Sequence, residues 1–152
     1  MLKRIITAVV ALGLFLPVLI FSGHEIGQYF FIIVLGLLTL ISMYEICCCF
    51  GVKKRIVISA PTYLFAVAAT VITIFWRGSE KYTAYLLCTG FVFLFSVFVA
   101  SMFNTGNIRY SQTASLVATA FYITCGFLSI INLRYSEFGG YLFWLVFIGA
   151  WA

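Results

Sequence analysis

The chain has 152 residues, of which 64% are hydrophobic and 9% charged, and its formal net charge is +5. A water-soluble domain carries about 25% charged residues, so this composition excludes a soluble globular fold and indicates a protein whose main solvent is lipid. The nine basic residues are scattered along the chain, without the dense positive surface that nucleic-acid binding requires, so no nucleic-acid partner is expected.

Long apolar segments separated by short polar loops account for most of the sequence. Five complete membrane spans are predicted, at Ile5–Phe21, Tyr29–Cys49, Ile56–Trp76, Tyr82–Met102 and Ala114–Ile131. Each approaches the ~20 residues that a helix needs to cross the hydrocarbon core. Backbone groups in lipid must be hydrogen-bonded within the segment, and the short alternating segments of a barrel are not found. The predicted fold is therefore an all-α integral membrane protein, with residues 1–152 forming a single polytopic membrane domain.

The first span resembles a signal peptide in one respect, because Lys3 and Arg4 precede its apolar run. However, the run Ile5–Phe21 is longer than a usual signal-peptide core, and no cleavage site of small residues follows it. We therefore expect a retained transmembrane helix.

A sixth apolar segment opens near Phe138 and is cut at Trp151-Ala152. Its uncharged stretch would reach roughly 22 Å as a helix, short of the ~30 Å hydrocarbon core. A carboxylate at that depth would be costly. We therefore expect a truncated sixth span in the N-terminal part of a longer membrane protein.

The loop charges predict the orientation of the spans. Six basic residues lie before span one or in the loops after spans two and four: Lys3, Arg4, Lys53, Lys54, Arg55 and Arg109. The alternate loops carry three: Arg77, Lys81 and Arg134. The positive-inside rule then places the N-terminus in the cytoplasm, in a multi-pass protein of the cytoplasmic (inner) membrane.

The acidic residues limit the chemistry that the chain can perform. There is no aspartate, and the four glutamates are Glu25, Glu45, Glu80 and Glu137. Only Glu45 falls within a predicted span, where an ionisable residue is a functional candidate. The alternative is an interfacial carboxylate paired with a cation of the adjacent basic loop or of the N-terminus. No catalytic, cofactor-binding or metal-binding residue is predicted.

For the cysteines and for the small residues of span five, we prefer a structural interpretation to a functional one. Cys47-Cys48-Cys49 is interpreted as small hydrophobic residues near the interface, with S-acylation or redox sensing as the alternative. The spacing of the five cysteines does not suit zinc, and His24 is the only histidine. Ser111, Ser115 and Thr119 recur every four residues, which favours close helix packing over a substrate-lining role.

Three short segments of the sequence are informative: the opening Met1–Thr7, the pair Tyr44-Glu45 and the closing Gly149–Ala152. Together they resemble segments of the bacterial phosphatidate cytidylyltransferase (CDP-diacylglycerol synthase) family. The chain opens with Met1-Leu2-Lys3-Arg4-Ile5-Ile6-Thr7, a common start in that family before a hydrophobic helix. Tyr44-Glu45 matches an aromatic-glutamate pair ahead of a basic loop. Gly149-Ala150-Trp151-Ala152 matches the lead-in to an Asp-Thr-x-Ala-Tyr motif, and the sequence stops where the aspartate would come.

The resemblance implies transfer of CMP from CTP to phosphatidic acid, giving CDP-diacylglycerol and pyrophosphate in phospholipid biosynthesis. The signature acidic and Mg²⁺-binding residues of that family lie in its second half, so none can be assigned here. The segment would be an N-terminal scaffold, inactive alone, that contacts membrane lipids and contributes to a possible homodimer. The alternative function is a small non-enzymatic polytopic protein, either a transporter subunit or a scaffold.

Overall fold

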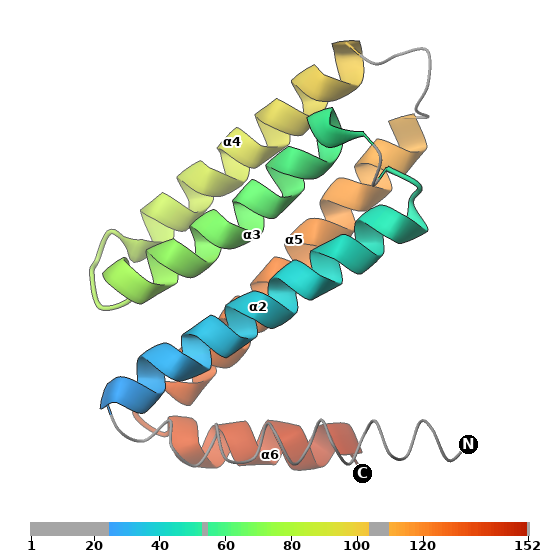
Figure 1. The fold of residues 1–152 in the computed structure, drawn as a ribbon. Coiled ribbons are helices and arrows are strands. Elements are labelled where there is room, and N and C mark those ends of the chain that lie inside the picture. Colours follow the sequence, from blue (N-terminus) through green and yellow to red (C-terminus); the bar gives the residue numbers. More distant parts are fainter. Residues whose placement is uncertain (1–24, 53–54, 104–109, 152) are drawn as a thin grey trace. The chain divides into compact units, whose positions relative to one another are not determined.

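The computed structural model describes residues 25–52, 55–103 and 110–151, and every regular element in these ranges is an α-helix (Figure 1). The helices are α2 (Glu25–Cys49), α3 (Ile56–Trp76), α4 (Tyr82–Phe103), α5 (Tyr110–Arg134) and α6 (Gly139–Trp151). Four of them, α2 to α5, are long and apolar enough to cross a membrane. The described part of the chain thus confirms the all-α prediction and suggests a multi-pass membrane protein.

The predicted spans two to five each coincide with one helix. The limits of α3 are those predicted, whereas α5 extends the predicted Ala114–Ile131 by about a turn at each end. The sixth segment is helical in α6, which has 13 residues. The predicted first span, Ile5–Phe21, lies outside the described residues, so five complete spans remain a prediction. Also outside are His24, Ala152 and the cations Lys3, Arg4, Lys53, Lys54 and Arg109.

The chain divides into two compact units, residues 1–34 and 35–152. In the first unit, the described residues form the beginning of α2. The second unit contains the rest of α2 and the four following helices, and its packing positions the sites discussed below. The prediction of a single membrane domain stays a prediction.

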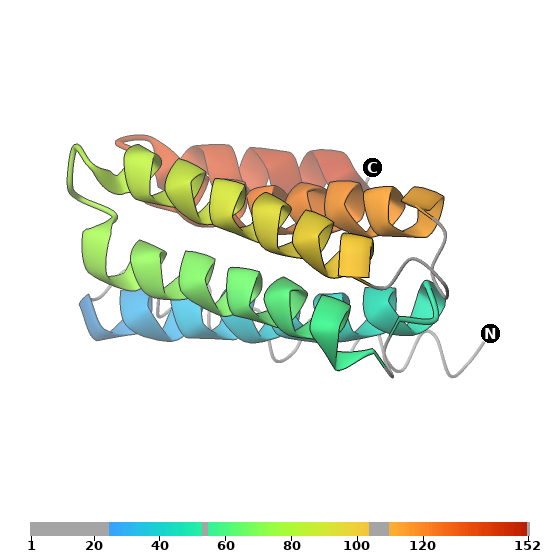
Figure 2. The same ribbon diagram turned by 90° about the horizontal axis from the view of Figure 1, so that it is seen from above.

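Within the second unit, α3 packs along α4, both helices contact α5, and α6 packs on α5 (Figure 2). One core cluster lies near the middle of these helices and includes Met43, Phe65, Phe93 and Ala120. The rings of Phe65 and Phe93 are stacked with their centroids 4.5 Å apart. A second cluster, which includes Ile46, Cys47, Ile58, Ala100 and Leu116, joins the end of α2 to the start of α3.

The face by which α5 packs differs from the predicted one. Ser111 and Ser115 are exposed, together with Ala114 and Ala118 beside them. The buried residues of α5 are instead Thr113, Leu116, Val117, Ala120, Thr124 and Ile131. The described packing of α5 therefore does not use the small-residue face, because larger apolar side chains on another face fill the contacts with α3 and α4.

The cysteine run forms the last turn of α2, and a glycine ends that turn. Gly51 adopts a φ of +68°. Its amide donates to the carbonyl of Cys48 at 3.1 Å, and the Val52 amide donates to that of Cys47 at 3.0 Å. These two bonds form a Schellman motif, accompanied by an apolar contact between Cys47 and Val52 in one core cluster. Cys47 is buried as an ordinary core residue, whereas Cys48 and Cys49 are exposed.

Because α3 and α4 run in opposite directions, the helix ends of the second unit gather in two places (Figure 1). We call one the Glu45 end; it contains the end of α2 and the starts of α3 and α5. We call the other the Arg77 end; it contains the α3–α4 loop, the end of α5 and the start of α6. The length of α3, with its 21 residues, separates them by roughly 30 Å.

Candidate functional site

Glu45 lies on the exposed face of α2, four residues before the end of the helix. Its neighbours on this face are apolar or aromatic: Ile41 is 55% exposed and Tyr44 is 46% exposed. Four residues correspond to about 6 Å of helix, so the carboxylate lies within reach of the membrane interface. The structure therefore places the predicted candidate at the edge of an apolar surface rather than in the packed core.

The surroundings of Glu45 do not favour a negative charge. A carboxylate near the C-terminus of a helix faces the negative end of the helix dipole, at a cost of about 0.3–1 kcal/mol. No ion pair joins Glu45 to a cation within the described part of the chain, while Lys53 and Lys54 lie outside it. Neither packing nor a described partner accounts for a glutamate here, and Glu45 remains a functional candidate.

Glu45 lies far from the glutamates of the loops, so it cannot share a metal ion with them. Glu80 and Glu137 are exposed in loops at the Arg77 end, whereas Glu45 lies at the opposite end. A divalent cation bound by two carboxylates needs both oxygens within about 2.0–2.6 Å of the metal. In the part of the chain that the structure describes, no group of three or more His, Cys, Asp or Glu residues could hold a metal ion.

Two arginines and a tyrosine form a compact group at the Arg77 end. The guanidinium carbon of Arg77 lies 3.7 Å from the centroid of the Tyr135 ring, a cation–π contact. Burial raises the pKa of Tyr135, and the positive charges of Arg77 and Arg134 partly oppose that rise. Arg77 stacks on this ring, and Arg134 directly precedes Tyr135 in the chain. The group joins the α3–α4 loop to the end of α5.

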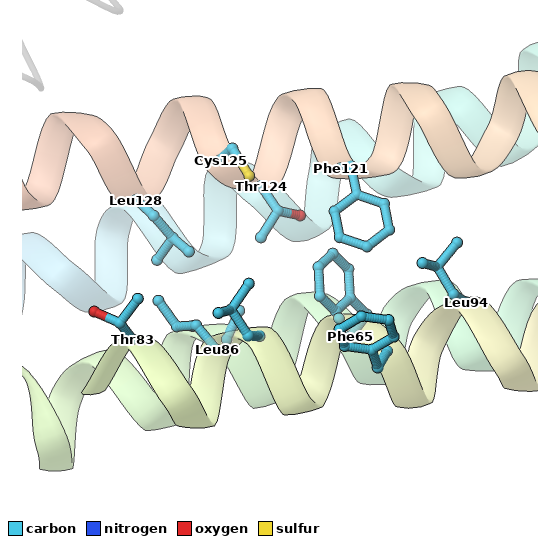
Figure 3. A pocket seen from close by; sticks show the side chains of 12 residues that line it. Phe65, Thr83, Leu86, Leu94, Phe121, Thr124, Cys125 and Leu128 are labelled. Carbon is cyan, nitrogen blue, oxygen red and sulfur yellow. The ribbon is translucent and has the colours of Figure 1, made fainter. Parts of the chain in front are cut away.

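A pocket of about 400 Å³ lies among α3, α4 and α5 (Figure 3). Its wall is almost entirely apolar, and it begins near Thr83 and Leu128, on the side of the Arg77 end. It closes near the middle of the helices, at Phe65, Phe121 and Leu94. The ring centroids of Phe65 and Phe121 are 5.1 Å apart, and Phe93 packs against both rings from behind. This arrangement gives the pocket a firm aromatic floor.

Small residues on facing helices leave room for the pocket. Gly90 is buried, and a Cβ there would lie 3.1 Å from the Phe121 ring. Ala69 lines the pocket from α3 and is 1% exposed. On the outer side, Leu87 and Phe91 are 61% and 70% exposed. The pocket therefore opens sideways between α4 and α5, toward the surface that faces lipid if these helices cross a membrane.

Thr124 is the buried polar residue of this pocket, and its hydroxyl has no hydrogen-bond partner. Several other helical threonines donate to the carbonyl four residues earlier, as Thr62 and Thr73 do at 3.1 and 2.8 Å. Thr113 lies on the same face of α5, about three turns before Thr124. Its hydroxyl also has no hydrogen-bond partner, but it does not line the pocket. The Thr124 hydroxyl is therefore a single buried polar group in an otherwise apolar wall.

Comparison with known proteins supports the sequence resemblance. Residues 2–152 match the model of the cytidylyltransferase family, which includes CDP-diacylglycerol synthase. The chain belongs to the cytidylyltransferase family. Comparisons with curated proteins and with solved structures found no match. Family membership suggests a nucleotidyltransferase role, and it places Glu45 in a chain for which such a role is expected.

Sequence reasoning on this cytidylyltransferase-family chain singled out Glu45 but missed the pocket. The pocket depends on residues of three helices, including Ala69, Gly90 and Thr124, whose spacing along the chain gives no common motif. Each is an ordinary small residue for a transmembrane helix. The contact of Arg77 with Tyr135 joins residues far apart in sequence, and it could not be predicted from the sequence either. In both cases the signal lies in the packing of the helices.

Proposed function

We propose that this chain forms the N-terminal part of a phosphatidate cytidylyltransferase, which transfers CMP from CTP to phosphatidic acid. The products are CDP-diacylglycerol, used in phospholipid biosynthesis, and pyrophosphate. The observation that carries the proposal is the family match over residues 2–152. The opening Met1–Thr7 segment, Tyr44-Glu45 and the closing Gly149–Ala152 segment support the specific enzyme within that family.

The proposed topology has five complete membrane spans followed by the apolar helix α6, with a cytoplasmic N-terminus in the inner membrane. The four apolar helices α2 to α5 support it, together with the surplus of basic residues in alternate loops. In this orientation the Glu45 end faces the cytoplasm and the Arg77 end faces the other side of the membrane. Glu45 then lies on the side where CTP is available.

We assign the Mg²⁺ chemistry of the enzyme to residues outside this segment. Mg²⁺ bound at carboxylates would hold and neutralise the triphosphate, as in other nucleotidyl transfers. The wide separation of Glu45 from Glu80, and the lack of any aspartate in the sequence, support this assignment. The 152 residues would then supply the membrane scaffold, with phosphatidic acid, CTP and a second copy of the chain as partners of the whole enzyme.

The test is an assay of CDP-diacylglycerol formation with CTP, Mg²⁺ and phosphatidic acid in reconstituted membranes. We expect no turnover by residues 1–152 alone, and turnover by the product of the whole reading frame. Turnover by the 152-residue chain would refute the scaffold assignment. A lack of turnover by the whole product, with the protein present at normal yield in the membrane, would refute the enzyme and favour a non-enzymatic membrane protein.

A further inference from the structure

The depth of the pocket among α3, α4 and α5 matches one leaflet of a bilayer. From Thr83 to Leu94 it follows 11 residues of α4, which is about 16 Å of helix. Half of the hydrocarbon core is about 15 Å. The pocket begins near the membrane edge at the Arg77 end, and Phe65 and Phe121 close it near the midplane. A single extended hydrocarbon chain entering from that edge would end at this aromatic floor.

The lining and the opening of the pocket suit a hydrocarbon chain. Ligand pockets of about 300–1,000 Å³ are ordinarily apolar with a few polar groups that fix orientation. Here the wall offers only Thr83 at the entrance and Thr124 inside as hydroxyl-bearing residues. Leu87 and Cys125, which line the pocket from α4 and α5, are exposed and would face the hydrocarbon region if these helices cross a membrane. A chain could therefore enter directly from the surrounding lipid.

Two arginines lie at the same helix ends as the entrance of the pocket. Arg134 follows Leu128 by six residues, about 9 Å along α5, and Arg77 contacts Tyr135 beside it. Both arginines are half-buried against the helices, whereas Glu80 and Glu137 in the same loops are exposed. Lys81, also exposed, adds a third cation. Guanidinium groups bind phosphate oxygens well. Those of Arg77 and Arg134 lie at the same helix ends as the entrance, the first on the Tyr135 ring and the second beside Gly140 at the start of α6.

We propose that this pocket binds one anionic glycerophospholipid, with an acyl chain between α3, α4 and α5 and its phosphate at Arg77 and Arg134. This site lies at the opposite end of the helices from Glu45, so it is distinct from the proposed site of reaction. The lipid fills the space that Ala69 and Gly90 leave and links α4 to α5. It serves as a structural or regulatory ligand, and its binding does not depend on the cytidylyltransferase assignment.

The first experiment measures which phospholipid the 152-residue chain retains. The protein is released from vesicles of equal phosphatidylglycerol and phosphatidylcholine with identical acyl chains, and the bound lipid is identified by native mass spectrometry. We expect phosphatidylglycerol to be preferred by roughly threefold to tenfold, the effect of one or two charge-assisted contacts. The double variant Arg77→Gln/Arg134→Gln should lose this preference, whereas Glu80→Gln/Glu137→Gln should keep or increase it. An unchanged preference in the arginine variant would overturn the headgroup assignment.

The second experiment tests the acyl chain. Cys125 and Cys88 are both exposed, but only Cys125 lines the pocket. Cys125→Trp should lower retention of both phospholipids by roughly tenfold, because it displaces several methylene groups, and Cys88→Trp should not. Thr124→Val should leave retention unchanged or raise it, like Thr113→Val. A loss confined to Thr124→Val would show a polar ligand instead and would overturn the proposal.

A third measurement needs no substitution. Phosphatidylglycerol is added to the detergent-solubilised chain, and alkylation of Cys125 and Cys88 by N-ethylmaleimide is followed by peptide mass spectrometry. We expect the lipid to slow alkylation of Cys125 severalfold relative to Cys88. Equal rates at both cysteines, with or without the lipid, would contradict binding in this pocket.

Discussion

A close contact of α2 with α3 depends on a glycine, which makes Gly36→Ala a sensitive test of the packing. A Cβ at position 36 would lie 2.5 Å from Thr70 Cγ2 and 3.0 Å from Thr70 Oγ1. Ordinary carbon–carbon contact requires about 3.5–4.0 Å, so one helix must move by about 1 Å. The Thr70 hydroxyl donates to the Ala66 carbonyl at 2.9 Å, which holds that side chain in place.

Two opposing effects set the size of the change. Replacing glycine by alanine within a helix stabilises it by about 1 kcal/mol. Overpacking a well-filled contact costs about 1–3 kcal/mol. The net effect of Gly36→Ala on the free energy of unfolding is therefore about 0–2 kcal/mol of destabilisation. In a Thr70→Ala background the two closest atoms are removed and only the Cβ at position 70 remains, 3.3 Å away. Gly36→Ala should then be neutral or stabilise by up to about 1 kcal/mol.

The assay is a double-mutant cycle of Gly36→Ala and Thr70→Ala, with thermal unfolding measured in detergent. A coupling of about 1–3 kcal/mol is expected, because Thr70→Ala removes the two atoms that a Cβ at position 36 meets most closely. Gly126→Ala is the matched control, since a Cβ at Gly126 would meet no atom within 4 Å. It should be neutral or stabilising. Additive effects of Gly36→Ala and Thr70→Ala would refute the close contact of α2 with α3.

Three further predictions concern other parts of the chain. Glu45→Gln removes a charge from an apolar face near the negative end of the α2 dipole, so yield and thermal stability should stay the same or rise slightly. Turnover of the whole enzyme should fall. Normal turnover at normal yield would show that Glu45 has no functional role. Gly51→Ala forces an alanine into φ +68° and should cost about 1 kcal/mol in thermal unfolding, whereas Gly51→Asn should cost less. The pKa of Tyr135 is raised above its ordinary value of 10.0, so the unfolded chain ionises first and stability falls as pH increases from about 10 toward the folded-state pKa. Tyr135→Phe should remove that part of the alkaline loss, and identical pH profiles of the two proteins would contradict it.

The positions of the helices could be predicted because charge and apolar length determine them directly. Arg55 and Arg77 flank α3, and its limits were predicted correctly for that reason. The ends of α5 were less certain, since polar residues such as Ser111 and Asn132 continue the helix beyond the apolar run. A helix outside the hydrocarbon core does not need apolar side chains, so hydropathy alone underestimates its length.

The packing faces and the pocket could not be predicted from the sequence. Helices that are apolar all round carry no amphipathic stripe to mark the buried side, unlike helices of soluble proteins. The stripe of Ser111 and Ser115 is small enough for close packing, yet α5 buries Leu116 and Ala120 instead. Similarly, Gly90 on α4 matters because it lets the Phe121 ring of α5 approach closely, beside the pocket that both residues line. The buried faces of the helices and the shape of the pocket therefore depend on pairs of residues on different helices.

The two ends of the second unit allow the two proposals to be tested independently. Glu45 and the lipid entrance at Arg77 are separated by the length of α3, roughly 30 Å. At this distance, pairwise effects on stability ordinarily add. Glu45→Gln should therefore change turnover of the whole enzyme without altering phosphatidylglycerol retention, and Arg77→Gln/Arg134→Gln should alter retention. A parallel loss of turnover in the arginine variant would show that lipid at the Arg77 end and chemistry at the Glu45 end are coupled through the α3–α5 packing.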